Sequence, residues 1–307
     1  MDWGKGFLEN FHKNPGKRNR FLGLFFTIAI IGSIGFLTAF DIFKHWNTID
    51  DSERSQAGID LVQTVATITG GIAIFWNIIL SRKQLAASLD QNITNRFEQA
   101  VGYLGNNNLT VRVGAIYAFE RIAKDSLKDH WTVMEVLMSF ITEKCSHRNS
   151  TSQNNNNDFP RDVQAAILVI GRRRIEFDHL GAIIRLNKVQ LSGSIFSYLD
   201  FSNAHFIWSD LSNVNFFMVN LKGANFYRSK LNKAVFYKAS LYNSELIESD
   251  LRGADFRECD LTGAKLNRAN LREAKGLSVE QVKLAHGWQE AFYDDDFRNQ
   301  LGLNISS

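Results

Sequence analysis

The chain is poor in the residues that build disulfide frameworks and metal centres. Only two cysteines occur, Cys145 and Cys259, and they lie far apart in the sequence. The seven histidines show no ligand spacing, and no second pair completes a zinc site beside Cys145 and His147. We therefore expect no disulfide, no metal and no cofactor, and a reducing compartment.

Catalytic signatures are also lacking. The sequence contains no GxGxxG, no P-loop and no GxSxG motif. Acidic residues between 185 and 275 alternate with basic ones, as on a solvated surface, and Asp294–Asp296 has the character of a solvated acidic tail. With 35 basic and 32 acidic residues the net charge is only +3, which gives no overall reason to expect nucleic acid. The sequence predicts a protein that is not an enzyme.

The most prominent feature of the sequence is a repeat of five residues. From residue 186 to residue 271, every fifth residue is Leu or Phe. Five residues turn a helix by about 140° and reverse the side of a strand, so neither element brings these residues to one face. They all point inward only if the chain turns a corner once per repeat, which predicts a solenoid. The eighteen centres are Leu186, Leu191, Phe196, Phe201, Phe206, Leu211, Phe216, Leu221, Phe226, Leu231, Phe236, Leu241, Leu246, Leu251, Phe256, Leu261, Leu266 and Leu271.

The other repeat positions agree with a tightly wound coil. Most residues two before a centre are Ala or Ser, and Cys259 takes this small inward position, so we expect it to be an inert core residue. Four glycines fall two after a centre, where a corner uses their freedom in φ: Gly193, Gly223, Gly253 and Gly263.

Strings such as LKGANF, LRGADF and LTGAKL resemble the pentapeptide-repeat superfamily, A(D/N)LXX in tandem, over roughly residues 180–276. The resemblance implies a right-handed quadrilateral β-helix in which four repeats make one coil. Eighteen repeats would then stack to a height of about 20 Å. We assign residues 175–276 to this solenoid and residues 277–307 to a C-terminal cap and tail, with a short helix from Leu277.

Two long segments without charge, 21–40 and 61–81, are each long enough to cross a bilayer as a helix. Basic residues precede the first segment and follow the second, whereas the loop 41–60 is mostly acidic. The positive-inside bias therefore predicts a transmembrane hairpin at 21–81, with a cytoplasmic segment 1–20 and a periplasmic loop 41–60. Both termini would be cytoplasmic, in a bacterial inner (cytoplasmic) membrane.

The second span carries a polar stripe on one helical face, with an apolar break at Ile74. Its members are Asp60, Gln63, Thr67, Gly70 and Asn77. Two interpretations remain open. The stripe packs against the first span or against its copy in a second subunit, or several copies line an aqueous path.

Residues 82–174 are expected to form a cytoplasmic helical module with a mobile polar loop at 149–158. Helices are expected to continue to 104, to break at Gly105, and to resume around Val111–Ile122 and Val133–Ile141, with Asp129 as a cap. A last helix begins near Pro160 and is closed by Gly171. This helical module resembles a HEAT-type repeat, and its sequence is similar to that of a module that precedes pentapeptide repeats in many bacterial membrane proteins. We expect it to cover the first coil.

In a square coil, residues twenty apart stack, which predicts two outward apolar columns on opposite faces. One column comprises Ile207, Trp208, Tyr227 and Ile247. The other comprises Phe217, Met218 and Tyr237. Such patches are typical of protein contact; alternatively, the preceding helices or the tail cover one of them.

The resulting hypothesis is a non-enzymatic scaffold anchored in the inner membrane, with partners that include the membrane, a second copy of itself and a cytoplasmic protein, but no nucleic acid. The alternative is an oligomeric, membrane-depolarising pore of the defence or toxin type. A third function, the DNA mimicry by which acidic members of the superfamily protect gyrase, is disfavoured. Residues 185–275 hold 13 basic and 9 acidic residues, a net charge of +4, which is the wrong sign.

Overall fold

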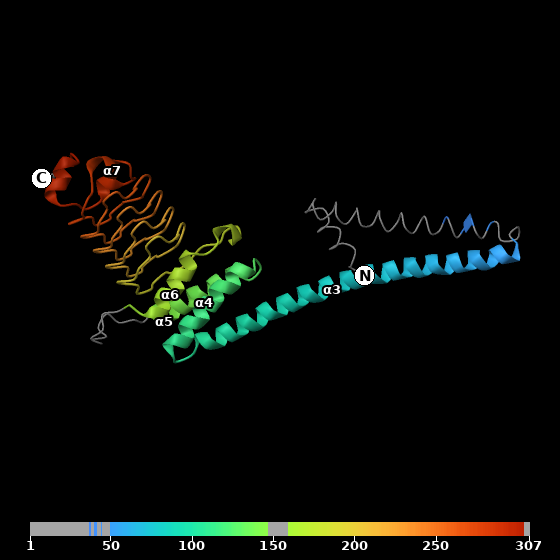
Figure 1. Cartoon of the computed structure of the whole chain (residues 1–307). Coiled ribbons are helices and arrows are strands. Elements are labelled where there is room, and N and C mark those ends of the chain that lie inside the picture. Colours follow the sequence, from blue (N-terminus) through green and yellow to red (C-terminus); the bar gives the residue numbers. More distant parts are fainter. Residues whose placement is uncertain (1–36, 38–39, 42–43, 45–49, 147–158, 304–307) are drawn as a thin grey trace. The chain divides into compact units, whose positions relative to one another are not determined.

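The computed structural model describes residues 37, 40, 41, 44, 50–146 and 159–303 (Figure 1). The chain divides into two compact units, Met1–Asp90 and Gln91–Ser307. The predicted segment 1–20, almost all of the first span at 21–40 and the loop 149–158 lie outside the described residues.

The main element of the first unit is α3, Asp51–Leu104, a continuous helix of 54 residues whose last turns belong to the second unit. It begins ten residues before the predicted span 61–81, so the second half of the predicted loop 41–60 is helical. The acidic side chain of Glu53 in the first turn favours this start, because its negative charge is stabilised by the positive end of the helix dipole. By length and composition, α3 is the one helix among the described residues that is able to cross a membrane.

The helical module consists of the end of α3 with α4 (Leu109–Asp125), α5 (His130–Cys145) and α6 (Arg161–Gly171). Their predicted apolar stripes meet in one core, where Phe97 of α3 packs edge-on against Phe119 of α4 at 5.4 Å. Asn108 caps α4 by accepting the amide of Thr110.

The prediction that the Asp129 side chain caps α5 is wrong. Asp129 stands at the N-cap position, but its side chain makes no capping bond and accepts the hydroxyl of Ser126 at 2.6 Å instead. Its φ and ψ of −96° and −7° are helical, and a capping side chain needs an extended backbone.

The predicted solenoid is confirmed as a coil of four repeats. Parallel bridges join residues twenty apart, from Arg185↔His205 to Asp255↔Lys275. From Leu191 onward, the amide three residues after each centre donates to the centre's carbonyl, as Ser194 does to Leu191 at 3.1 Å. At the first corner the amide of Val189 donates to the hydroxyl oxygen of Ser209 instead. Residues two after a centre all have positive φ, from 52° at Met218 to 77° at Gly193. Regular coiling starts near Arg185 rather than at 175, and Ile175–Phe177 forms the 3-10 helix η2.

Stacked side chains fill the interior of the solenoid. Phe206 lies over Phe226 at 5.2 Å, and Phe216, Phe236 and Phe256 form a second stack at 5.2 and 5.3 Å. All of these rings are fully buried. Cys259 is buried as expected, and burial raises the pKa of its thiol, so it is protonated and unreactive.

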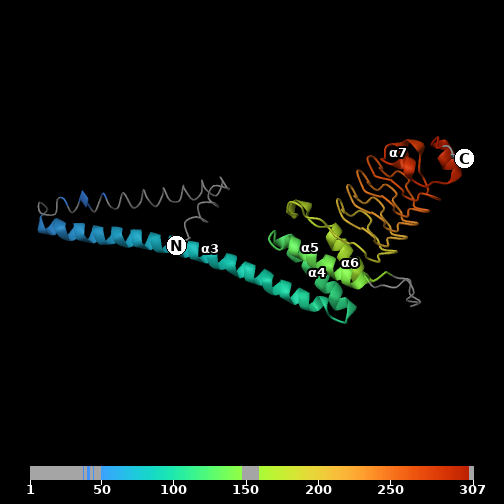
Figure 2. The ribbon, with the colours of Figure 1, turned by 180° about the vertical axis from the view of Figure 1, so that it is seen from behind.

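The C-terminal cap continues the coil (Figure 2). Its helix α7, Val279–Lys283, has a capping box made by Ser278 and Gln281, and His286 and Phe292 extend two bridge columns. The 3-10 helix η3 (Trp288–Glu290) and the helix α8 (Asp295–Gln300) complete it. Asp294, which we expected in a solvated tail, accepts the amide of Glu273 at 2.7 Å, so the tail is part of the cap.

Candidate interaction surfaces

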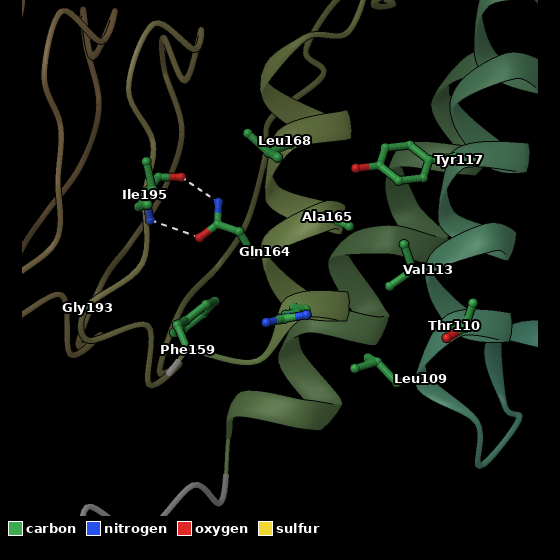
Figure 3. A pocket seen from close by; sticks show the side chains of 11 residues that line it. Leu109, Thr110, Val113, Tyr117, Phe159, Gln164, Ala165, Leu168, Gly193 and Ile195 are labelled. Carbon is green, nitrogen blue, oxygen red and sulfur yellow. Dashed lines mark hydrogen bonds between the residues drawn. The ribbon is translucent and has the colours of Figure 1, made fainter. Parts of the chain in front are cut away.

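The helical module closes the first coil of the solenoid with direct hydrogen bonds. The side-chain amide of Gln164 in α6 donates to the carbonyl of Ile195 at 2.7 Å and accepts its N–H at 2.9 Å, as a neighbouring strand would (Figure 3). The carbonyls of Cys145 and Gly171 accept the amides of Gln190 and Asp200. These bonds satisfy groups that an open coil end would expose, so the expected covering role is borne out.

A buried polar network fastens the same junction. The ring nitrogens of His130 lie 3.0 Å from the carbonyl of Ala123 and 3.1 Å from Asp178. Arg173 donates to the carboxylate of Asp178 at 2.9 Å and to the carbonyl of Asp200 at 2.9 Å. The sequence showed only a run of three arginines here, because the network joins residues that are distant in the chain.

An open groove of about 620 Å³ lies beside this junction, between α4, α6 and the first coil (Figure 3). Among the described residues that line it, Arg161 is the only charged one, and the others are apolar or neutral polar. The remaining lining residues are Leu109, Thr110, Val113, Tyr117, Phe159, Gln164, Ala165, Leu168, Gly193 and Ile195. Such a lining offers a contact surface rather than acid–base chemistry.

On each side of the solenoid, three residues of every repeat point outward. They are the residue before the central Leu or Phe and the two residues that follow it. We call the side around Phe196, Phe216, Phe236 and Phe256 the Phe217 face, and the side around Leu186, Phe206, Phe226, Leu246 and Leu266 the Ile207 face. The predicted columns lie on these two faces.

On the Phe217 face, aromatic side chains form a continuous outward column. Tyr198 is 69% exposed and packs edge-on against Phe217 at 5.2 Å, and Phe217 lies 5.5 Å from Tyr237. The cations of Lys238 and Arg257 lie over the ring of Tyr237 at 5.1 and 5.2 Å. Met218 beside the column is 45% exposed, so the face is open to solvent.

On the Ile207 face, Trp208 is 51% exposed and lies 6.3 Å from Tyr227. The guanidinium of Arg228 lies over both rings, at 4.9 and 5.1 Å, and pairs with Glu248. Ile207 and Ile247 are half-buried above and below Tyr227 in the same column. The two remaining sides are mostly polar, and Arg252 there holds the pKa of Asp250 below its usual value through their hydrogen bond.

The polar stripe of α3 is exposed at every position: Asp60, Gln63, Thr67, Gly70 and Asn77. Within residues 61–81, the half-buried positions fall on a different face of the helix: Leu61, Thr64, Ile68, Phe75 and Ile79. The hydrogen bonds described for the stripe are local to α3, such as the Thr67 hydroxyl donating to the carbonyl of Gln63. Within the described chain, the stripe is therefore left facing outward.

Comparison with known protein families identifies the solenoid. A family model for pentapeptide repeats matches eight copies within residues 184–275. A search of curated proteins found no match. In the residues that the structure describes, no group of three or more His, Cys, Asp or Glu is arranged to hold a metal ion.

Solved structures give similar regions. HetL, a pentapeptide repeat protein involved in heterocyst differentiation regulation in the cyanobacterium Nostoc sp. strain PCC 7120, is 30% identical over 30% of this chain and 38% of its own, with a TM-score of 0.29. A second Nostoc PCC 7120 pentapeptide repeat protein is 19% identical over 36% of this chain and 84% of its own, with a TM-score of 0.29. One from the Arabidopsis thaliana thylakoid lumen is 28% identical over 36% and 70%, with a TM-score of 0.13.

The family match and the bridges between residues twenty apart lead to the same assignment. Residues 184–275 are a run of pentapeptide repeats, a fold of the scaffold and interaction type.

Proposed function

We propose that this protein is a non-enzymatic scaffold, anchored in a bacterial inner membrane with both termini in the cytoplasm, whose solenoid docks proteins on two opposite faces. The observation that carries the proposal is the pair of exposed aromatic columns. Leu and Phe side chains fill the inside of the coil, so aromatic groups outside it are not needed to hold the coil together. Exposed on a rigid frame, they suit recognition, because aromatic anchors dominate protein interfaces.

Anchoring is supported by α3, which is apolar enough to span a bilayer, and by the charge asymmetry around the two sequence spans. The outward polar stripe supports homo-oligomerisation. Polar and small residues on one face of a spanning helix find partners on another helix, and interhelical hydrogen bonds of this kind contribute roughly 0.6 kcal/mol each.

The scaffold is tested by site-specific photo-crosslinking of the full-length protein in cells. A photoreactive aromatic residue replaces Tyr198 on one face or Trp208 on the other; matched controls replace Asn213 and Asn243, which hold the same repeat position on the two polar sides. We expect adducts of discrete mass from positions 198 and 208 and none from the controls. Equal adducts from all four positions, or none from any, would refute the docking function.

A second candidate function is the membrane-depolarising pore. The outward orientation of Gln63, Thr67 and Asn77 favours it as well, since several copies arranged around an axis would present this stripe to water. The two functions differ in subunit number and in the effect of the stripe on cell growth.

A further inference from the structure

Charge is distributed unevenly over the four sides of the solenoid. The Ile207 face carries five basic and two acidic residues, whereas no other side has an excess of more than one charge of either sign. The basic residues are Arg185, Lys188, Arg228, Lys265 and Arg268, and the acidic ones are Glu245 and Glu248. The net +4 of the repeats is therefore concentrated on a face that also carries aromatic anchors.

The uncompensated charges lie at the two ends of this face. Arg185 and Lys188 in the first coil and Arg268 in the last are exposed, and no ion pair joins their side chains to any residue that the structure describes. The apolar column of Ile207, Trp208, Tyr227 and Ile247 lies between these ends. An apolar centre with a charged rim is the usual anatomy of a protein-binding surface.

The acidic groups of the face are already neutralised. Lys265 donates to Glu245 at 2.6 Å, and Arg228 pairs with Glu248. Around the adjacent corner, Asp210 lies 3.8 Å from Lys230 and Asp250 lies 2.7 Å from Arg252. The charge left available to a partner is therefore positive.

The lowered pKa of His205, which lies on the same face, is consistent with the positive charge of this face. Burial lowers the pKa of His205, and the positive charge of Arg185 lowers it further, against a weaker opposing effect of Glu245. The imidazole is thus disfavoured as a cation, because the site is partly desolvated and already positive.

Nucleic acid fits this surface less well than protein. Strand-binding proteins stack bases on open aromatic rings, but Arg228 already lies over both Trp208 and Tyr227. Ile207 and Ile247 offer no surface on which bases could stack. Aliphatic and aromatic side chains of a protein segment suit the same positions.

We propose that the Ile207 face binds an acidic protein segment, whose Leu- or Phe-like side chains pack on the column around Tyr227 and whose carboxylates pair with Arg185, Lys188 and Arg268. This rests on the docking function proposed above and specifies the chemistry of one of the two partners.

The test measures binding of a fluorescent peptide to the full-length protein in detergent by anisotropy. The probe is made of Asp and Glu interrupted by Leu and Phe; one control peptide carries Lys and Arg in place of the acids, and another carries Ser in place of Leu and Phe. Arg185→Gln/Lys188→Gln/Arg268→Gln is expected to weaken the acidic apolar peptide about tenfold, since exposed pairs contribute up to about 1 kcal/mol each. Trp208→Ala is expected to weaken it by a similar factor.

The matched control is Lys222→Gln/Lys233→Gln/Arg272→Gln, which removes the same charge from the two polar sides and is expected to change affinity by about twofold or less. Equal losses in the two triple variants, or equal binding of the basic or Ser-containing peptide, overturn the proposal. Tighter binding of single-stranded DNA also overturns it. If the acidic peptide fails while crosslinks at position 208 persist, docking stands and the acidic partner does not.

Discussion

At the scale of single residues, the corners of the coil set the strictest demands. Fourteen residues other than glycine adopt the left-handed conformation two after a centre, which costs roughly 1 kcal/mol each. The solenoid tolerates this because the corners from Leu191 onward are each fixed by their own hydrogen bond and all are fixed by the coils next to them. Glycine is needed only where space is also short.

Substitutions at Gly193 and Gly223 distinguish the cost of a strained backbone from the cost of steric crowding. A methyl group at Gly193, with φ of 77°, meets nothing within 4 Å, whereas at Gly223, with φ of 69°, it comes within 2.4 Å of Oδ1 of Asn203 in the coil below. We expect Gly193→Ala to lower the free energy of unfolding by about 1 kcal/mol and Gly223→Ala by more, measured by urea denaturation of the full-length protein. In an Asn203→Gly background the two substitutions should become equally costly. Equal losses of unfolding free energy from the two substitutions in the natural sequence would show that crowding by Asn203 does not contribute.

At the scale of elements, the sequence predicted whatever depends on a period and missed whatever depends on long-range contacts. The fivefold repeat defined the coil, its inward residues and its corners, and helical periodicity defined the module. The start of α3 at Asp51 was missed because the helix extends beyond its apolar segment. Gln164 was missed because no local pattern shows that a glutamine will act as a strand partner for Ile195.

The same contrast applies to the candidate surfaces. The aromatic columns follow from counting in steps of twenty, so Tyr227 and Tyr237 could be placed from the sequence. The free charge of the Ile207 face could not, because it depends on which carboxylates find a partner, as Glu245 does with Lys265.

Gly171 tests the contact between the module and the first coil. A methyl group there would lie 2.6 Å from Cβ of Leu199 and 2.8 Å from Cε2 of Phe201. We expect Gly171→Ala to destabilise the protein by about 1–2 kcal/mol through overpacking, even though alanine is the better helix former. Hydrogen exchange should show lost protection at the amide of Asp200, which donates to Gly171.

The matched control is Gly114→Ala in α4, where the added methyl group meets nothing within 4 Å. This helical substitution should stabilise the protein by about 0.5–1 kcal/mol. Stabilisation by both substitutions would mean that α6 is not closely packed against the first coil.

At the scale of the whole molecule, both proposed functions depend on what the outward stripe of α3 contacts. Another exposed side of the helix, roughly 100° around the axis from the stripe, carries Val62, Thr69 and Ala73 and lacks a comparable polar stripe, so it provides an internal comparison. Burial of Gln63, Thr67 and Asn77 between subunits satisfies their polar groups in either a scaffold or a pore.

The decisive measurement is the mass of the detergent-solubilised full-length protein by light scattering, with single-particle imaging. For Gln63→Leu/Thr67→Leu/Asn77→Leu, we expect the subunits to dissociate at roughly twentyfold higher protein concentration than for the natural sequence, because three interhelical hydrogen bonds of about 0.6 kcal/mol each are lost. Val62→Leu/Thr69→Leu/Ala73→Leu, on the other exposed side, should leave assembly unchanged. A ring of four or more subunits with α3 at its centre, together with growth inhibition that the stripe variant abolishes, would establish the pore in place of the scaffold. A dimer whose stripe variant leaves growth unaffected would support the anchored scaffold, and a protein that assembles identically in all three forms would show that the stripe is not an interface.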